Sequence, residues 1–115
     1  MERDALLVRT KAFALRVMKL VEALPKGVAW RTIGHQLLRA ATSVGADYRA
    51  AQRGRPKAEF VAKLRIVLEE ADECCYWLEL VIEGGLLPAR RVSELLSEDD
   101  ELTAIFVTAS KTAAA

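Results

Sequence analysis

The chain has 115 residues, of which 52% are apolar, with only six glycines and three prolines. This length suffices for one domain with its own core, and the composition favours long helices over many short strands. No apolar run approaches the roughly 18 residues of a membrane span, and the first residues lack the layout of a signal peptide, so we expect a cytoplasmic protein outside the membrane.

The net charge of +1 hides two halves of opposite sign. Residues 1–65 carry 14 Lys and Arg against 5 Asp and Glu, whereas residues 66–115 carry 3 against 11. Two explanations are open at this point: a face that binds nucleic acid, or attraction between basic and acidic helices within one chain or between copies.

The first two predicted helices cover residues 4–24 and 29–53, separated by Pro25 and Gly27. The second contains Gly34 and Gly45, and an interior glycine costs roughly 1 kcal/mol relative to alanine. We therefore expect another backbone to come close there. Asp47 falls on the apolar row of this helix, so we expect a buried polar residue that pairs with a basic side chain or accepts hydrogen bonds.

The third predicted helix, residues 56–83, has the most regular pattern. Its apolar row repeats at spacings of 4 and 3, and further apolar side chains lie beside that row. One neighbouring helix cannot cover so much apolar surface. The side chains that we expect at contacts between copies of the chain are Ile66, Tyr76, Trp77 and Leu80.

The fourth predicted helix covers residues 89–112 and is either continuous or split near Ser97, which could cap a new helix start. Four helices with short connections marked by proline and glycine predict an all-α fold. The expected architecture is an antiparallel up-down-up-down four-helix bundle, with residues 1–115 as a single domain.

The sequence offers little for catalysis. Cys74 and Cys75 lie in apolar rows and are expected to be reduced, buried thiols. A two-metal bundle uses Glu-x-x-His pairs, but His35 is the sole histidine, and outside the third helix only Asp47 and Asp99 could point inward. We therefore expect no enzyme activity, no cofactor and no metal site, with a carboxylate metal-binding bundle kept as an alternative.

Basic residues gather toward the connection between the second and third helices. Phosphate contacts require such a patch, but salt bridges to the acidic face of another copy would produce the same pattern. The candidate nucleic-acid-binding residues are Arg39, Arg49, Arg53, Arg55 and Lys57.

Residues 36–49, QLLRAATSVGADYR, and residues 58–64, AEFVAKL, together with YWLEL at 76–80, resemble the signature of a bacterial four-helix-bundle family. Its members are encoded in intervening sequences of large-subunit (23S) ribosomal RNA genes. The resemblance covers roughly residues 28–112 and implies a homo-oligomer, typically a pentameric ring. Asp47 and Ala50 depart from the family pattern, which usually has Asn followed three residues later by Glu.

A more distant resemblance is to the accessory protein of diversity-generating retroelements, which binds nucleic acid and a reverse transcriptase. Those relatives are expected to be strongly basic, whereas this chain is nearly neutral. The function expected from the sequence is a non-enzymatic, homo-oligomeric scaffold with RNA or DNA as a candidate partner.

Overall fold

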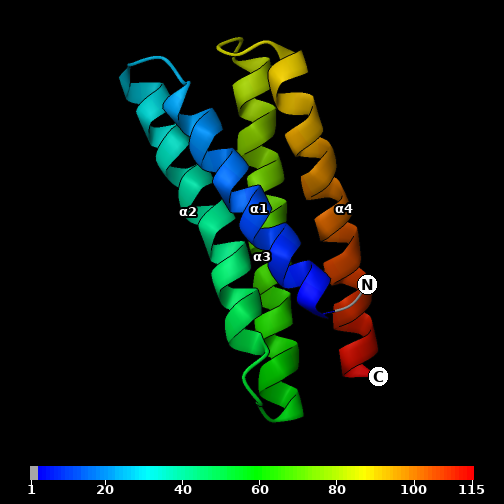
Figure 1. The fold of residues 1–115 in the computed structure, drawn as a ribbon. Helices are drawn as coiled ribbons and strands as arrows, with labels where there is room; N and C mark the ends of the chain where they lie inside the picture. Colours follow the sequence, from blue (N-terminus) through cyan, green and yellow to red (C-terminus); the bar gives the residue numbers. More distant parts are fainter. Residues whose placement is uncertain (1–2) are drawn as a thin grey trace.

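Residues 3–115 are described by a computed structural model, in which they form four helices. These are α1 (Arg3–Glu22), α2 (Val28–Ala51), α3 (Lys57–Glu83) and α4 (Ala89–Ala114). The chain runs up and down along the bundle, so that consecutive helices are antiparallel (Figure 1). The bounds lie within two residues of the predicted ranges, and the all-α up-down architecture is confirmed.

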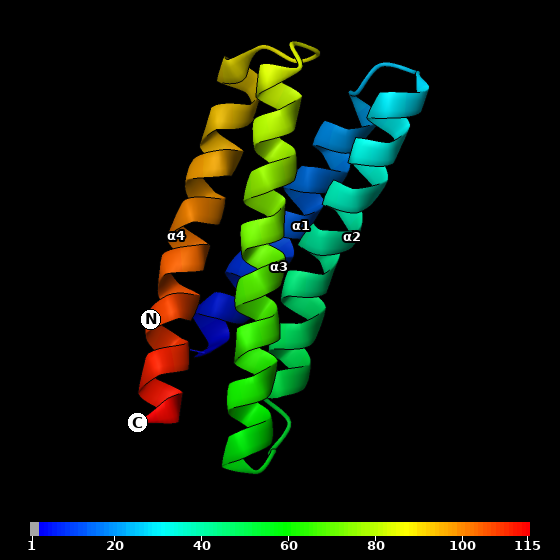
Figure 2. The ribbon, with the colours of Figure 1, turned by 180° about the vertical axis from the view of Figure 1, so that it is seen from behind.

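Each helix packs against the helices before and after it in the chain, and α1 also lies against α4, which closes the bundle. The two views in Figures 1 and 2 show α2, α3 and α4 nearly side by side, with the shorter α1 crossing over α3 from α4 toward α2. The molecule measures 44 × 22 × 20 Å along its principal axes. Among residues 3–115, no helix combines the length and apolarity needed to cross a membrane.

Proline and glycine set the ends of the helices as the sequence indicated. Pro56 and Pro88 immediately precede α3 and α4, where the N–H that proline lacks would have no partner within the helix. Gly54 and Gly85 have φ angles of 64° and 74°, which favour glycine at those turns. The fourth helix is continuous through Ser97, so the alternative of a break there is wrong.

The core is built from one apolar row on each helix. On α3, every residue of the predicted row from Leu64 to Val81 is buried. On α1, Thr10 occupies one inward position, where its hydroxyl donates to the carbonyl of Leu6 at 2.8 Å. This bond removes the cost of burying an unpaired hydroxyl. The largest buried side chains are Phe13, Phe106, Leu37, Leu64, Leu78 and Leu102.

The part of the chain that comes close to the two interior glycines of α2 is α1 and the turn that follows it. A Cβ at Gly45 would lie 3.5 Å from Thr10 Oγ1 and 3.6 Å from the Thr10 backbone carbon, which are ordinary contact distances. A Cβ at Gly34 would lie 3.2 Å from Val21 Cγ1, which is tighter. Small residues on α2 therefore let α1 lie close to it.

Replacing Gly45 by alanine is expected to stabilise the protein. The new methyl group fits at van der Waals distance, and alanine favours the helix by about 0.5–1 kcal/mol over glycine. Gly34→Ala is the matched comparison, and its gain should be smaller because Val21 must move. Urea unfolding of both variants measures the difference. A loss of stability in Gly45→Ala would contradict the spacing of α1 and α2.

Candidate functional site

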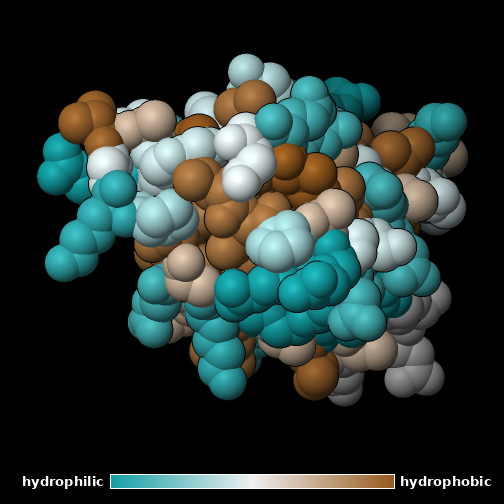
Figure 3. All heavy atoms as spheres, turned by 90° about the horizontal axis from the view of Figure 1, so that it is seen from above, coloured by the Kyte–Doolittle hydropathy of each residue, from teal (hydrophilic) through white to brown (hydrophobic). Residues whose placement is uncertain are grey.

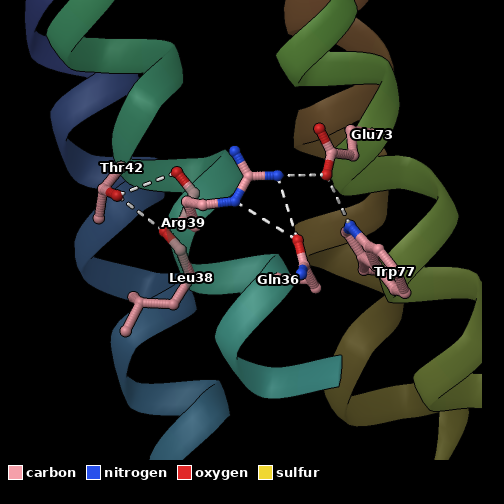
Figure 4. Close-up of polar contacts among 6 residues, drawn as sticks. All are labelled: Gln36, Leu38, Arg39, Thr42, Glu73 and Trp77. Carbon is pink, nitrogen blue, oxygen red and sulfur yellow. Dashed lines mark hydrogen bonds and ion pairs between the residues drawn. The ribbon is translucent and has the colours of Figure 1, made fainter. Parts of the chain in front are cut away.

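A polar cluster bridges α2 and α3 on the outside of the bundle (Figure 4). Arg39 Nη2 donates to Glu73 Oε1 at 2.9 Å and to Gln36 Oε1 at 3.1 Å. The indole N–H of Trp77 donates to the same Glu73 oxygen at 3.2 Å. An ion pair therefore connects Arg39 to α3, although the Arg39 side chain is 60% exposed.

The structure separates Arg39 from the other basic residues predicted to bind nucleic acid. Arg39 lies ten positions before Arg49 on α2, which corresponds to about 15 Å along the helix. Arg55 Nε donates to the carbonyl of Ala50 at 3.2 Å, at the end of α2. Four predicted residues share the exposed surface around the α2–α3 connection, which we call the basic corner: Arg49, Arg53, Arg55 and Lys57.

The residues predicted to contact another copy differ in exposure. Ile66 and Tyr76 are 41% and 55% exposed, whereas Trp77 and Leu80 are half-buried, Trp77 against the core of its own bundle. The rings of Tyr76 and Trp77 meet edge to face, with centroids 5.1 Å apart and an angle of 71°. Part of the surplus apolar surface of α3 is thus covered within one chain, and contact between copies at these residues stays a prediction.

The prediction that Asp47 is buried is wrong. Its side chain is 29% exposed and lies 4.0 Å from Lys63 Nζ on α3. The inward row of α2 continues from Val44 to Tyr48 instead, at a spacing of four, and the Tyr48 ring lies 5.5 Å from that of Phe106 on α4. Asp47 therefore sits at the edge of the α2–α3 contact, where pairing with a basic side chain, as expected, is available.

Glu70 lies on α3 beside Asp47. Burial, followed by a hydrogen bond to Asp47 and repulsion from Asp47 and Glu73, raises the pKa of Glu70 to about 8. At neutral pH the Glu70 carboxyl is therefore mostly protonated, and its proton can be donated to Asp47. The two carboxyl groups form a polar contact between helices rather than a site poised to react with a substrate.

Neither cysteine has the character of a nucleophile. Burial is the main cause that raises the pKa of the Cys74 thiol, and it also raises the pKa of Cys75 to about 11. The carboxylates around both thiols act in the same direction. A thiolate is the reactive form, so these environments disfavour catalysis by either cysteine.

The exposed apolar row on α1 was not predicted. Val8, Leu15 and Met18 are 68%, 54% and 42% exposed and follow one another at spacings of seven and three, which places them on one side of the helix. Beside this row, a groove of about 520 Å³ runs between α1 and α2. These spacings are visible in the sequence, where no role was assigned to Val8, Leu15 or Met18. The groove is lined by Leu7, Val8, Thr10, Lys11, Ala14, Thr42, Gly45, Ala46 and Arg49.

Apolar side chains also gather at the end of the bundle that carries the α1–α2 and α3–α4 connections. Figure 3 shows this end, with hydrophobic side chains in the middle and hydrophilic side chains around them. At the start of α2, Val28 is 74% exposed. A second groove in this region lies at the α1–α2 connection and includes Leu24, Trp30 and His35.

The protonated Glu70 predicts how stability depends on pH. Its pKa lies near 8 in the folded chain and near 4.5 in the unfolded chain, so the folded state holds the proton more tightly. This stabilisation is complete below about pH 4.5 and is lost as the pH rises through about 8. Glu70→Gln should flatten the fall in unfolding free energy measured by urea titration between these values.

Glu69→Gln is the matched control, because Glu69 is the exposed neighbour on the same helix. It should leave the pH dependence unchanged. Equal slopes for the wild type and Glu70→Gln would show that Glu70 titrates normally in the folded protein.

Comparison with known proteins assigns the chain to a family. Residues 5–108 match the family described as 23S rRNA-intervening sequence protein. No curated protein matches the chain. A crystal structure of a protein of unknown function from the S23 ribosomal protein family of Bacteroides thetaiotaomicron is similar, with a TM-score of 0.83 and 29% identity over 91% of this chain and 97% of that one. The chain therefore belongs to the 23S rRNA-intervening sequence protein family.

Proposed function

We propose that the protein is a non-enzymatic scaffold that assembles with copies of itself. The observation that carries this proposal is that the two halves of the bundle have opposite charge and that each half has exposed apolar side chains. Helices α1 and α2 carry eight Lys and Arg against three Asp and Glu, whereas α3 and α4 carry six against twelve. The exposed apolar row of α1 lies on the basic half, and Ile66 and Tyr76 lie on the acidic half.

Two different surfaces of this kind favour a head-to-tail contact, in which the basic half of one copy meets the acidic half of the next. Apolar contact supplies most of the free energy of association, and the charges select the partner and its orientation. A head-to-tail contact closes into a ring when the rotation between copies allows it. A ring of five copies is the assembly that the resemblance to the family implies.

Acidic substitutions on the apolar side chains of α3 should break this assembly. Ile66→Glu and Tyr76→Glu place a charge against the exposed apolar row of α1 in the next copy, where the proposed contact would be desolvated, and both side chains are exposed enough for the fold to tolerate the change. Light scattering after gel filtration should show a mass that falls toward the 12.7 kDa of one chain.

Val28→Glu is the matched control. Val28 is more exposed than either residue but lies at the end of the bundle, away from the sides of α1 and α3. It should leave the assembled mass unchanged. If Val28→Glu dissociates the protein and the two α3 variants do not, the contact surface proposed here is wrong.

A second candidate function is nucleic-acid binding at the basic corner. Arg49, Arg53 and Arg55 are exposed, and within residues 3–115 none of them forms an ion pair with an acidic side chain. Arginines in this state are available to phosphate groups. This observation favours the corner over Arg39, whose charge is already balanced by Glu73.

The test is a titration with single-stranded and double-stranded RNA and DNA at two salt concentrations. Arg53→Ala should weaken binding and reduce the dependence on salt by about one unit of slope, because one phosphate contact is lost. Arg39→Ala should have a much smaller effect, since it removes a contact within the protein. Absent binding, or binding that is independent of salt, would remove this candidate.

A further inference from the structure

Three potential metal ligands converge where the middle of α3 lies against α4. Cys75 is on α3, and Asp99 and Asp100 are on α4. One ligand atom from each of them lies within 4.8 Å of the other two. The Cys75 thiol donates to Asp100 Oδ1 at an Sγ–O distance of 3.8 Å. Asp99 is buried, Cys75 is half-buried and Asp100 is exposed, so the cluster is open to solvent on one side.

Asp99 is the part of this cluster that the fold alone does not explain. It is 0% exposed and occupies an inward position of α4 between Leu95 and Leu102. Neither of its carboxyl oxygens has a hydrogen-bond partner in the part of the chain that the structure describes. A buried carboxyl without a partner is costly, whether it is ionised or neutral.

The charges around Asp99 increase this cost. The negative charges of Asp100, Asp72 and Glu98 act on the buried Asp99 carboxyl. The charged groups that act on the Cys75 thiol are also all carboxylates, with Glu79 the largest contributor among them. From α1, Arg9 pairs with Glu98 and Glu101. The charged groups that act on Asp99 and Cys75 are themselves all negative.

We propose that Cys75, Asp99 and Asp100 bind a divalent cation of the zinc class between α3 and α4. A thiolate with two carboxylates suits zinc, which takes sulfur, nitrogen and oxygen ligands in a tetrahedral arrangement. With Zn–S and Zn–O distances of about 2.3 and 2.1 Å, a tetrahedral angle places sulfur and oxygen about 3.6 Å apart. The 3.8 Å between Cys75 Sγ and Asp100 Oδ1 is close to this value.

A bound cation would be held by the deprotonated forms of the three side chains, as metal ligands require. Three protein ligands leave a fourth position on the solvent side for water. The cation would also connect α3 to α4, and the stability of the folded state would rise with the logarithm of its free concentration above the dissociation constant. This inference does not depend on the proposed self-assembly.

The direct test uses Co²⁺ as a spectroscopic substitute for zinc. The full chain, stripped with a chelator and kept reduced, is titrated with Co²⁺ and then with Zn²⁺. The expected result is a sulfur-to-cobalt charge-transfer band that saturates at one Co²⁺ per chain and disappears when Zn²⁺ is added. Cys75→Ser should abolish the band, and Asp99→Asn should weaken Co²⁺ binding by more than about tenfold.

The adjacent thiol provides the control. Cys74 is buried in the core row of α3 and is not among the converging ligands, so Cys74→Ala should retain the band. Circular dichroism shows whether each variant is folded, and a rise in melting temperature with Zn²⁺ that Cys75→Ser loses gives a second readout. No band in the folded wild type, or a band that persists in Cys75→Ser, would overturn the proposal.

Discussion

The burial of one apolar row along α3 determines where the polar groups of the bundle lie. This helix lies between α2 and α4 and makes the most extensive contacts with both. The buried residues of α3 are apolar, so its charged side chains lie at the edges of its contacts with α2 and α4. The edge toward α2 holds Glu70 and Glu73, and the edge toward α4 holds Cys75. Polar groups at such edges are partly desolvated, which raises the cost of leaving them unpaired.

The two edges meet this cost in different ways. Toward α2, basic side chains are available: Arg39 balances Glu73, and Lys63 lies near Asp47. Toward α4, the opposing helix is itself acidic, and Asp99 is fully buried there without a partner among the described residues. Charge pairing within the chain is therefore good on the α2 side of α3 and poor on its α4 side, which is why the proposed cation lies between α3 and α4.

The fold followed from the sequence because apolar spacing determines which side of a helix is buried, and proline and glycine mark where helices stop. The buried row of α3 matches the predicted spacing. Prediction failed where spacing allowed two answers: after Val44, both Asp47 and Tyr48 continue the row of α2. In the structure Tyr48 is the buried one, with its ring against Phe106 on α4. The burial of Asp99 was foreseen only as one alternative, because a carboxylate in an apolar row is usually avoided. Which neighbour covers a helix face, as for Arg39 and the outer row of α1, depends on tertiary contacts that no local pattern contains.

In the proposed assembly, the basic and acidic halves of the bundle bring copies of the chain together. The decisive measurement is sedimentation equilibrium of the unmodified protein at low and at high salt. We expect a mass that is a multiple of 12.7 kDa at low salt, with weaker association at high salt because ions screen the charges between copies. A mass of 12.7 kDa at micromolar concentration under both conditions would contradict it.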